Sequence, residues 1–479
     1  MPINYIWTML NYSEVKTPCY VLDENRLRRN MDILSEIQKK TGVKIICALK
    51  GYSFWRSFPI IAEYLPGATA SSLNEARLAK EEMGKEVHVF APAYEDGEID
   101  EILTLADHIT FNSFSQWSRF KERALKAHVS CGIRVNPQYS TVETDLYNPC
   151  GKFSRLGVTE NEFKPELLDG IEGLHFHALC EQDVDALEGV LAAFEKHFGK
   201  YLDRMKWVNF GGGHHITRKD YHREDLVRLL NDFHNRYPHL QVIMEPGEAI
   251  GWQTGELVAN VADIVHNEMD IAILNVSVSA HMPDCLEMPY RPAITGADLP
   301  GVKKFTYKLT GNTCLAGDQL GDFSFDKPLQ IGDQIIFEDM IHYTMVKTTF
   351  FNGVKHPNIG MFDREGKFHL LHEFTYEQAS LRAIACQFTV VAATGNDAFR
   401  TVCQSHHTAE ASVLRRTGDV SVIGAVVHIA VEQTARDSSH TATAADRTPV
   451  GAVAHQGSAG KGSHQRAAEK GVGSYGGIA

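Results

Sequence analysis

Short apolar runs alternate with amphipathic segments between residues 17 and 247. The runs have the length of buried strands, and the segments between them carry apolar residues at helical spacing. We predict strands at Lys44–Leu49, Ala68–Ser71, Val87–Ala91, His108–Phe111, Cys131–Val135, Leu174–Ala178, Trp207–Phe210 and Val242–Glu245. We predict helices at Trp55–Tyr64, Leu73–Met83, Ile99–Ala106, Phe114–Ala127, Val184–Phe198 and Arg223–Arg236. Such alternation is typical of parallel βαβ units, so this α/β pattern predicts a closed (β/α)8 TIM-type barrel.

The pattern changes after Gly255 to alternation without long helices. Strand-like runs follow at Leu257–Val265, Ile271–Val278, Phe305–Leu309, Gln334–Phe337 and Tyr343–Phe350. We therefore predict a barrel domain over residues 15–250 and a C-terminal β domain over residues 251–378, which residues 1–14 join.

Residues 379–479 differ in composition from everything before them. They are rich in Ala, Thr, Ser, His, Gly and Val, contain two leucines and no tryptophan, and show no sustained periodicity. Such a segment buries too little apolar surface to offset the entropy of ordering it. We predict an atypical, disordered tail there, without an assigned function.

The formal net charge of −13 is unevenly distributed. Residues 379–479 hold nine Lys or Arg and seven Asp or Glu, so residues 1–378 carry −15. An acidic body argues against a nucleic-acid surface and favours a small cationic molecule as ligand.

The cysteines, the apolar runs and the first residues together indicate a cellular compartment. Its nine cysteines form no CxxC pair, which fits reduced thiols better than a disulfide framework or a zinc site. No apolar run approaches the length needed to span a bilayer, and the first residues lack the features of a signal peptide. We expect a cytoplasmic protein without a membrane partner.

The run KIICALKG places Lys50 directly after a strand that is apolar on both faces. Where such a strand opens onto a cavity, a desolvated lysine has a lowered pKa and condenses with an aldehyde cofactor as a Schiff base. The alternative is a lysine that extends from the strand end into water.

Glycines and a carboxylate end two later strands. Gly211, Gly212 and Gly213 follow the seventh strand, where bare backbone lets N–H groups approach a phosphate, unless they form only a tight turn. Glu245, in MEPGEA, ends the eighth strand and could keep a pyridine nitrogen protonated, or could belong to a buried ion pair.

Three further residues are candidates with plain alternatives. His177, in HFHAL, could lie flat on an aromatic cofactor or be a half-buried histidine with its hydrogen bonds satisfied. We place it and His175 on opposite faces of the strand, so they should not share a metal. Cys314, in NTCLAGD, could donate a proton or be a small apolar residue, and Tyr343 could bind phosphate or pack on the sheet.

The motifs taken together resemble a known family. ALKG, SRLG, HFHALCE, GGGHH, EPGEA, SAHMPDCLEMPYRP, NTCLAGD and HYTMVKTTFFNG occur in the order found in fold-type III pyridoxal-phosphate enzymes, and most closely in the carboxynorspermidine/carboxyspermidine decarboxylases. The resemblance covers residues 15–378. It implies an alanine-racemase-like barrel joined to a β domain, pyridoxal 5′-phosphate as cofactor, and a homodimer with active sites at the subunit interface.

The resemblance also implies a role for each candidate. Lys50 is similar to the Schiff-base lysine, His177 to the ring-stacking histidine, and Glu245 to the partner of the pyridine nitrogen. The remaining residues are assigned to the phosphate (Gly211, Gly212, Gly213, Tyr343), to the phenolic oxygen (Arg155), to protonation of the product from the partner subunit (Cys314) and to the amino groups of the substrate (Glu248, Asp284, Asp318).

One departure from related decarboxylases concerns the substrate. Enzymes acting on ornithine or diaminopimelate have EPGR where this chain has EPGE, so Glu248 replaces a cation. An anion there suits a polyamine tail and repels a second carboxylate. The resemblance thus implies decarboxylation of carboxynorspermidine and carboxyspermidine to norspermidine and spermidine. Another decarboxylase of this fold, acting on diaminopimelate, ornithine or arginine, a racemase, or a non-catalytic pyridoxal-phosphate carrier are the alternatives.

Overall fold

A computed structural model describes residues 10–383, and the predicted disordered tail lies outside them apart from its first few residues. The barrel strands are β2 (Lys44–Ile45), β3 (Cys47–Ala48), β4 (Gly67–Ala70), β5 (Glu86–Phe90), β6 (His108–Phe111), β7 (Ser130–Arg134), β8 (Gly173–His175), β9 (Trp207–Asn209) and β10 (Gln241–Met244). β2 pairs with β10 and β3 pairs with β4, both in parallel, so the single run Lys44–Ala48 closes the ring. The predicted barrel is confirmed.

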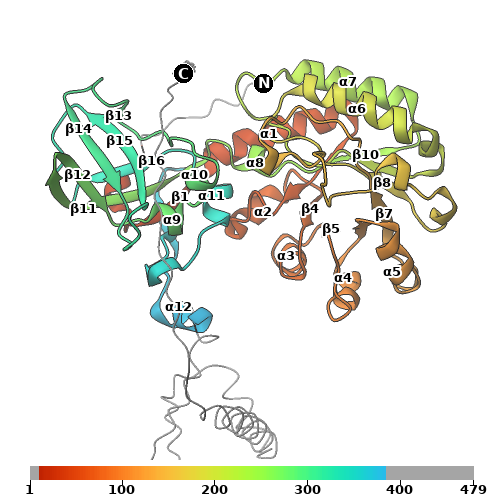
Figure 1. The fold of residues 1–479 in the computed structure, drawn as a ribbon, viewed down its shortest axis with the longest axis horizontal. Helices are drawn as coiled ribbons and strands as arrows, with labels where there is room; N and C mark the ends of the chain where they lie inside the picture. Colours follow the sequence, from red (N-terminus) through yellow and green to blue (C-terminus); the bar gives the residue numbers. More distant parts are fainter. Residues whose placement is uncertain (1–9, 384–479) are drawn as a thin grey trace, which may run out of the picture. The chain divides into compact units, whose positions relative to one another are not determined.

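The helices between these strands lie where they were predicted, but the first two are shorter, because Trp55–Ser57 and Ala79–Met83 form separate 3-10 and π turns. They are α2 (Phe58–Ile61), α3 (Leu73–Leu78), α4 (Ile99–Leu105), α5 (Phe114–Lys126), α6 (Val184–Phe198) and α7 (Arg223–Arg236). In Figure 1, α3, α4 and α5 lie on the outside of β4, β5 and β7. In α5 the Ser113 side chain caps the first turn, and Trp117, Phe120 and Ala124 are buried at helical spacing.

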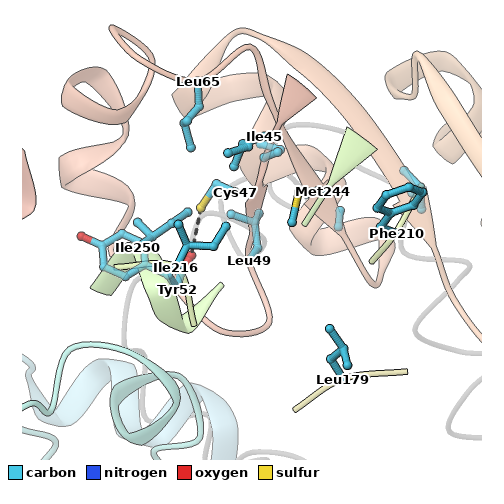
Figure 2. Packing of buried hydrophobic residues seen from close by; sticks show 14 of the residues in the cluster. Ile45, Cys47, Leu49, Tyr52, Leu65, Leu179, Phe210, Ile216, Met244 and Ile250 are labelled. Carbon is cyan, nitrogen blue, oxygen red and sulfur yellow. Dashed lines mark hydrogen bonds between the residues drawn. The ribbon is translucent and has the colours of Figure 1, made fainter. Parts of the chain in front are cut away.

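Alternate residues of the first barrel strand face different surroundings. Ile45, Cys47 and Leu49 belong to the large core that the helices cover, as Figure 2 shows for part of that cluster. Ile46 instead packs with Trp207 and Ile243 in a small separate cluster. Because side chains alternate across a strand, this second cluster and Lys50 lie on the inner face of the ring.

Two elements near the start of the described chain, a strand and a long helix, were not predicted from the sequence. β1 (Cys19–Asp23) pairs antiparallel with β11 and parallel with β17, so it belongs to the second sheet and not to the barrel segment that we began at residue 15. α1 (Glu24–Thr41) follows directly, with Asp23 as its N-cap and Gly42 in the left-handed region at its end.

The second sheet is confirmed as a mixed β domain. Its strands are β1, β11 (Gly255–Asn267), β12 (Met269–Leu274), β13 (Ala297–Asp298), β14 (Phe305–Thr310), β15 (Gln319–Phe325), β16 (Gln334–Phe337), β17 (Asn358–Phe362) and β18 (Phe368–His372). The described chain also contains the short helices α8 (Glu248–Gly251), α9 (Val278–His281), α10 (Asp284–Glu287) and α12 (Tyr376–Ala383).

One predicted strand is wrong. Residues Tyr343–Phe350 begin with a helical turn, α11 (Tyr343–Val346), in which the Lys347 N–H donates to the Tyr343 carbonyl at 2.9 Å. A short apolar run does not distinguish a strand from a buried helical turn. No helix among residues 10–383 has both the length and the apolar character of a membrane span.

Candidate active site

A cavity of about 580 Å³ opens at the carboxyl ends of the barrel strands. It collects most of the residues that the sequence singled out: Lys50, Arg155, His177, Gly212, Gly213, Glu245, Glu248 and Tyr343 line it. These residues are scattered over almost 300 positions of the chain, from Lys50 to Tyr343. Their convergence at one rim is what a parallel barrel produces, because every strand delivers its following loop to the same face.

Lys50 lies in the turn that follows β3, held by the Gly51 N–H, which donates to the Ala48 carbonyl at 3.0 Å. Its side chain is exposed to the cavity, and the walls of the cavity surround it with protein atoms. Burial lowers the pKa of Lys50, and the nearby Arg134 charge lowers it further, against the attraction of Glu245. A lowered pKa makes the nucleophilic, unprotonated amine easier to reach than in an exposed lysine.

Glu245 is fixed by a residue that the sequence analysis missed. The Asn209 side-chain amide donates to Glu245 Oε1 at 2.7 Å, and its oxygen accepts from the Gly211 N–H at 2.8 Å. Glu245 is only 6 % exposed, and Oε2 lies 3.7 Å from His175 Nε2. Asn209 thus links the carboxylate to the glycine loop.

The glycine loop requires residues without side chains. Gly211 and Gly213 have φ angles of +68° and +84°, and a Cβ at either would overlap the carbonyl of the preceding loop. The Gly212 N–H donates to His177 Nδ1 at 3.1 Å. Because Nδ1 accepts, the ring proton of neutral His177 is on Nε2.

His175 and His177 do not point to opposite faces, and that expectation is wrong. Residues two apart share a face, and one ring nitrogen of each, with a Glu245 oxygen, lie within 4.8 Å of one another. Burial lowers the pKa of both histidines well below the usual value, and the Lys50 and Arg134 charges add to it. Both rings are therefore neutral.

Two arginines border the same region. Arg134 was missed by the sequence analysis; it is 5 % exposed, lies over the Phe90 ring at 4.6 Å and donates to the His177 carbonyl at 3.2 Å. Burial lowers its pKa to about 10. Arg155 is exposed at the cavity, and the Asn112 side chain holds its carbonyl at 2.8 Å.

The end of the cavity near the β domain is acidic. Glu248, at the start of α8, and Glu181, which has a φ of +52°, both line the cavity. Burial raises the pKa of both carboxyl groups, while the nearby His342 lowers it. His342 precedes Tyr343 and lies between Glu248 and Asp339.

Four predicted residues do not line the cavity of this chain: Gly211, which lies at the base of the glycine loop, and Asp284, Asp318 and Cys314. Asp284 accepts from Tyr290 and Thr344 at 2.8 and 2.7 Å, immediately beside α11. Asp318 is 3 % exposed, and its two oxygens accept from Val278, Ser279 and Thr313, among others. This arrangement favours a role for Asp318 in shaping the loop. Cys314 is exposed on that loop.

A family model described as "Pyridoxal-dependent decarboxylase, C-terminal sheet domain" matches residues 19–341. The chain belongs to the pyridoxal-dependent decarboxylases. It is 48 % identical over 382 residues to a carboxynorspermidine/carboxyspermidine decarboxylase of Campylobacter jejuni, covering 78 % of this chain and 99 % of that protein. It is 51 % identical over 366 residues to a carboxyaminopropylagmatine decarboxylase of Synechocystis, covering 76 % and 95 %.

Solved structures of such decarboxylases share the fold. The crystal structure of a Campylobacter jejuni carboxynorspermidine decarboxylase complexed with norspermidine has a TM-score of 0.72, with 48 % identity over 77 % of this chain and all of that one. A diaminopimelate decarboxylase of Helicobacter pylori has a TM-score of 0.65 at 19 % identity, covering 78 % of this chain and 98 % of that one, which shows the fold alone.

The cavity fits the cofactor of this decarboxylase family. It offers a lysine whose pKa is lowered, a buried carboxylate fixed by Asn209, a loop of side-chain-free backbone, and the cavity-lining Arg155 and Tyr343. An amine, an acceptor for a pyridinium proton and a phosphate cradle are the three features that pyridoxal phosphate requires.

Proposed function

We propose that this chain decarboxylates carboxynorspermidine and carboxyspermidine to norspermidine and spermidine. The proposal is supported by the names of two relatives, from Campylobacter jejuni and Herminiimonas arsenicoxydans, the second 36 % identical over 364 residues. The single observation that carries it is the pair of carboxylates, Glu181 and Glu248, at one end of the cavity.

The charge of this pair selects the substrate. An ammonium tail of a polyamine would find two carboxylates within a partly buried site, where attraction is stronger than in water. Diaminopimelate would instead bring a second carboxylate toward Glu248 and Glu181, at a cost in electrostatic free energy. The cavity therefore favours a substrate whose distal end is cationic.

The remaining residues act on the other end of the substrate. When bound, pyridoxal phosphate supplies an electron sink for the pair left at Cα as carbon dioxide departs. Lys50 would hold the cofactor, Glu245 would accept the hydrogen bond of its ring nitrogen, and His177 would pack against its ring. Gly211–Gly213, Tyr343 and Arg155 would bind its oxygens. Lys50 or Cys314 returns a proton to Cα.

Cys314 reaches this chemistry only from a second copy of the chain. It is exposed, it does not line the cavity of its own chain, and Leu315 and Phe351 beside it expose 45 % and 47 % of their surface. Exposed apolar side chains beside an exposed thiol fit a subunit interface. We propose a homodimer in which each subunit supplies Cys314 to the active site of the other.

A second candidate substrate is carboxyaminopropylagmatine, because the Synechocystis relative is named for it. Its guanidinium end is also cationic and would pair with a carboxylate through two parallel hydrogen bonds. Glu181 and Glu248 thus select a cationic tail, and both an ammonium and a guanidinium group meet that requirement.

Carbon dioxide release tests the proposal. Purified holoenzyme should release it from carboxynorspermidine or carboxyaminopropylagmatine, and much more slowly from diaminopimelate or ornithine. Lys50→Ala should abolish turnover and the visible absorbance of the bound cofactor, whereas Lys39→Ala, an exposed lysine of α1, should change neither. Preference for diaminopimelate would overturn the substrate assignment, and unchanged turnover in Lys50→Ala would overturn the mechanism.

A further inference from the structure

We propose that Glu86, His88 and His108 form a binding site for a divalent transition-metal ion of the Zn²⁺ class at the amino end of the barrel. The site is distinct from the cofactor cavity, which none of the three residues lines. His88 is 4 % exposed, while the Glu86 side chain is 35 % exposed, so an ion could enter from solvent beside Glu86.

The strand register brings the three side chains together. His88 on β5 is paired directly with His108 on the adjacent parallel strand β6. Glu86 precedes His88 by two residues and so shares its face. A ligand pair at i and i+2 on one strand, with a third ligand in register on the next, directs three donors to one point.

The donors are close to metal-binding distances. One ligand atom of each residue lies within 4.8 Å of the others, and His88 Nε2 is 3.4 Å from Glu86 Oε2. The two imidazole rings stack with centroids 4.1 Å apart, and buried Nδ1 of His108 has no hydrogen-bond partner in the described chain. Zinc with bonds of about 2.0–2.1 Å needs donors about 3.3 Å apart, so coordination requires the three side chains to turn toward one point.

The chemistry of the donor set suits zinc. Two imidazoles and a carboxylate leave a fourth position for water. The unpartnered Nδ1 of His108 offers a lone pair, and the Glu86 carboxylate, which pairs with Lys44, offers an anionic oxygen. Lys44 Nζ, 2.8 and 3.0 Å from the Glu86 oxygens, is the cation that an incoming metal displaces. Its side chain is 34 % exposed and can turn to solvent.

The surroundings indicate a structural role for the ion. The His108 and Trp207 rings make an edge-to-face contact, with their centroids 5.4 Å apart. Trp207 in turn packs with Ile46 and Ile243, between this site and the other end of the barrel. The amino face of such barrels contributes stability and not catalysis. A bound ion would join β5 to β6 and stabilise the folded state by mass action.

Zinc titration of the full-length, cofactor-loaded enzyme against a chromophoric chelator tests the site. We expect Glu86→Gln and His108→Ala to remove one zinc equivalent per chain or to weaken it by at least about 100-fold, since even outer-shell partners contribute about 10–100-fold. His266→Ala, an exposed histidine paired with Asp270, is the matched control and should not change the titration. Decarboxylation should be unaffected by Glu86→Gln.

Zinc should also raise the melting temperature of the unsubstituted enzyme and of His266→Ala, and not that of Glu86→Gln. X-ray absorption of the zinc-loaded enzyme does not depend on any variant folding, and it should show two imidazoles and oxygen ligands. Equal stoichiometry in all variants, or sulfur ligands, would overturn the proposal, because the zinc would then be bound elsewhere.

Discussion

Glu248 Oε1 lies 3.9 Å from His342 Nδ1, and His342 Nε2 lies 3.3 Å from Asp339 Oδ1. Burial alone would lower the pKa of His342, but Asp339 and Glu248 outweigh it and raise the pKa to about 9. Burial raises the pKa of Glu248, and the His342 cation opposes that rise. The charge of the carboxylate that we assign to the substrate tail therefore depends on His342.

This arrangement predicts an acid limb in the pH profile. The tail binds the ionised carboxylate, so kcat/KM should fall as pH drops through the Glu248 pKa, at a higher pH than for an ordinary glutamate. His342→Gln removes the cation, raises the Glu248 pKa further and should move the limb to higher pH. The measurement is kcat/KM against pH in both enzymes.

Glu248→Gln removes the charge of the carboxylate and keeps the size of the side chain. Losing a charge-assisted contact should raise KM for a polyamine substrate by about 10–100-fold and remove the acid limb. The exposed Glu224→Gln on α7 removes the same charge and should leave both unchanged. An acid limb that persists in Glu248→Gln would assign it to another group.

The barrel and much of its rim could be predicted from the sequence because their signals are local. A buried apolar run with a lysine or glycines at its end, such as that of Lys50 or of Gly211, marks both a strand and the face on which its loop emerges. Strand pairing then brings these ends to one cavity.

Other parts depend on partners far away in the chain. Asn209 is recognised as a site residue only from its hydrogen bonds to Gly211 and Glu245. Arg134 becomes part of the site only through the register of β7 with β8. The pairing of β1 with β11 and β17 is similarly non-local. Periodicity carries no information about such contacts.

The left-handed Gly213 should be essential for cofactor binding. Gly213→Ala would strain the backbone at φ +84° and force the new Cβ against the Leu179 carbonyl, which displaces the phosphate loop. We expect the affinity for pyridoxal phosphate, measured by titration of its visible absorbance, to fall by about tenfold or more. Gly97→Ala, where a Cβ meets nothing within 4 Å, is the control. Equal affinities would remove the loop from the phosphate site.

Mixed dimers test the proposed sharing of active sites. Lys50→Ala and Cys314→Ala should each lose most activity as pure proteins. If Cys314 acts on the other subunit, a mixed dimer has one site with both substitutions and one with neither, so mixing under dissociating conditions should restore activity. No recovery in dimers shown to be mixed would place both residues in one chain.

Asp318 should be a stability residue. Its carboxylate accepts from the Val278 N–H at 2.6 Å, the Ser279 N–H at 3.0 Å and the Thr313 hydroxyl at 2.5 Å, and so ties α9 to the loop that carries Cys314. Asp318→Asn would replace one acceptor oxygen by an N–H₂ group that faces these donors. We expect the free energy of unfolding to drop by about 2 kcal/mol. Denaturant titration measures that drop. Asp322→Asn, at a partly exposed carboxylate that pairs with Lys308 on the neighbouring strand, is the comparison and should cost much less. A large rise in KM at unchanged stability would instead return Asp318 to the substrate.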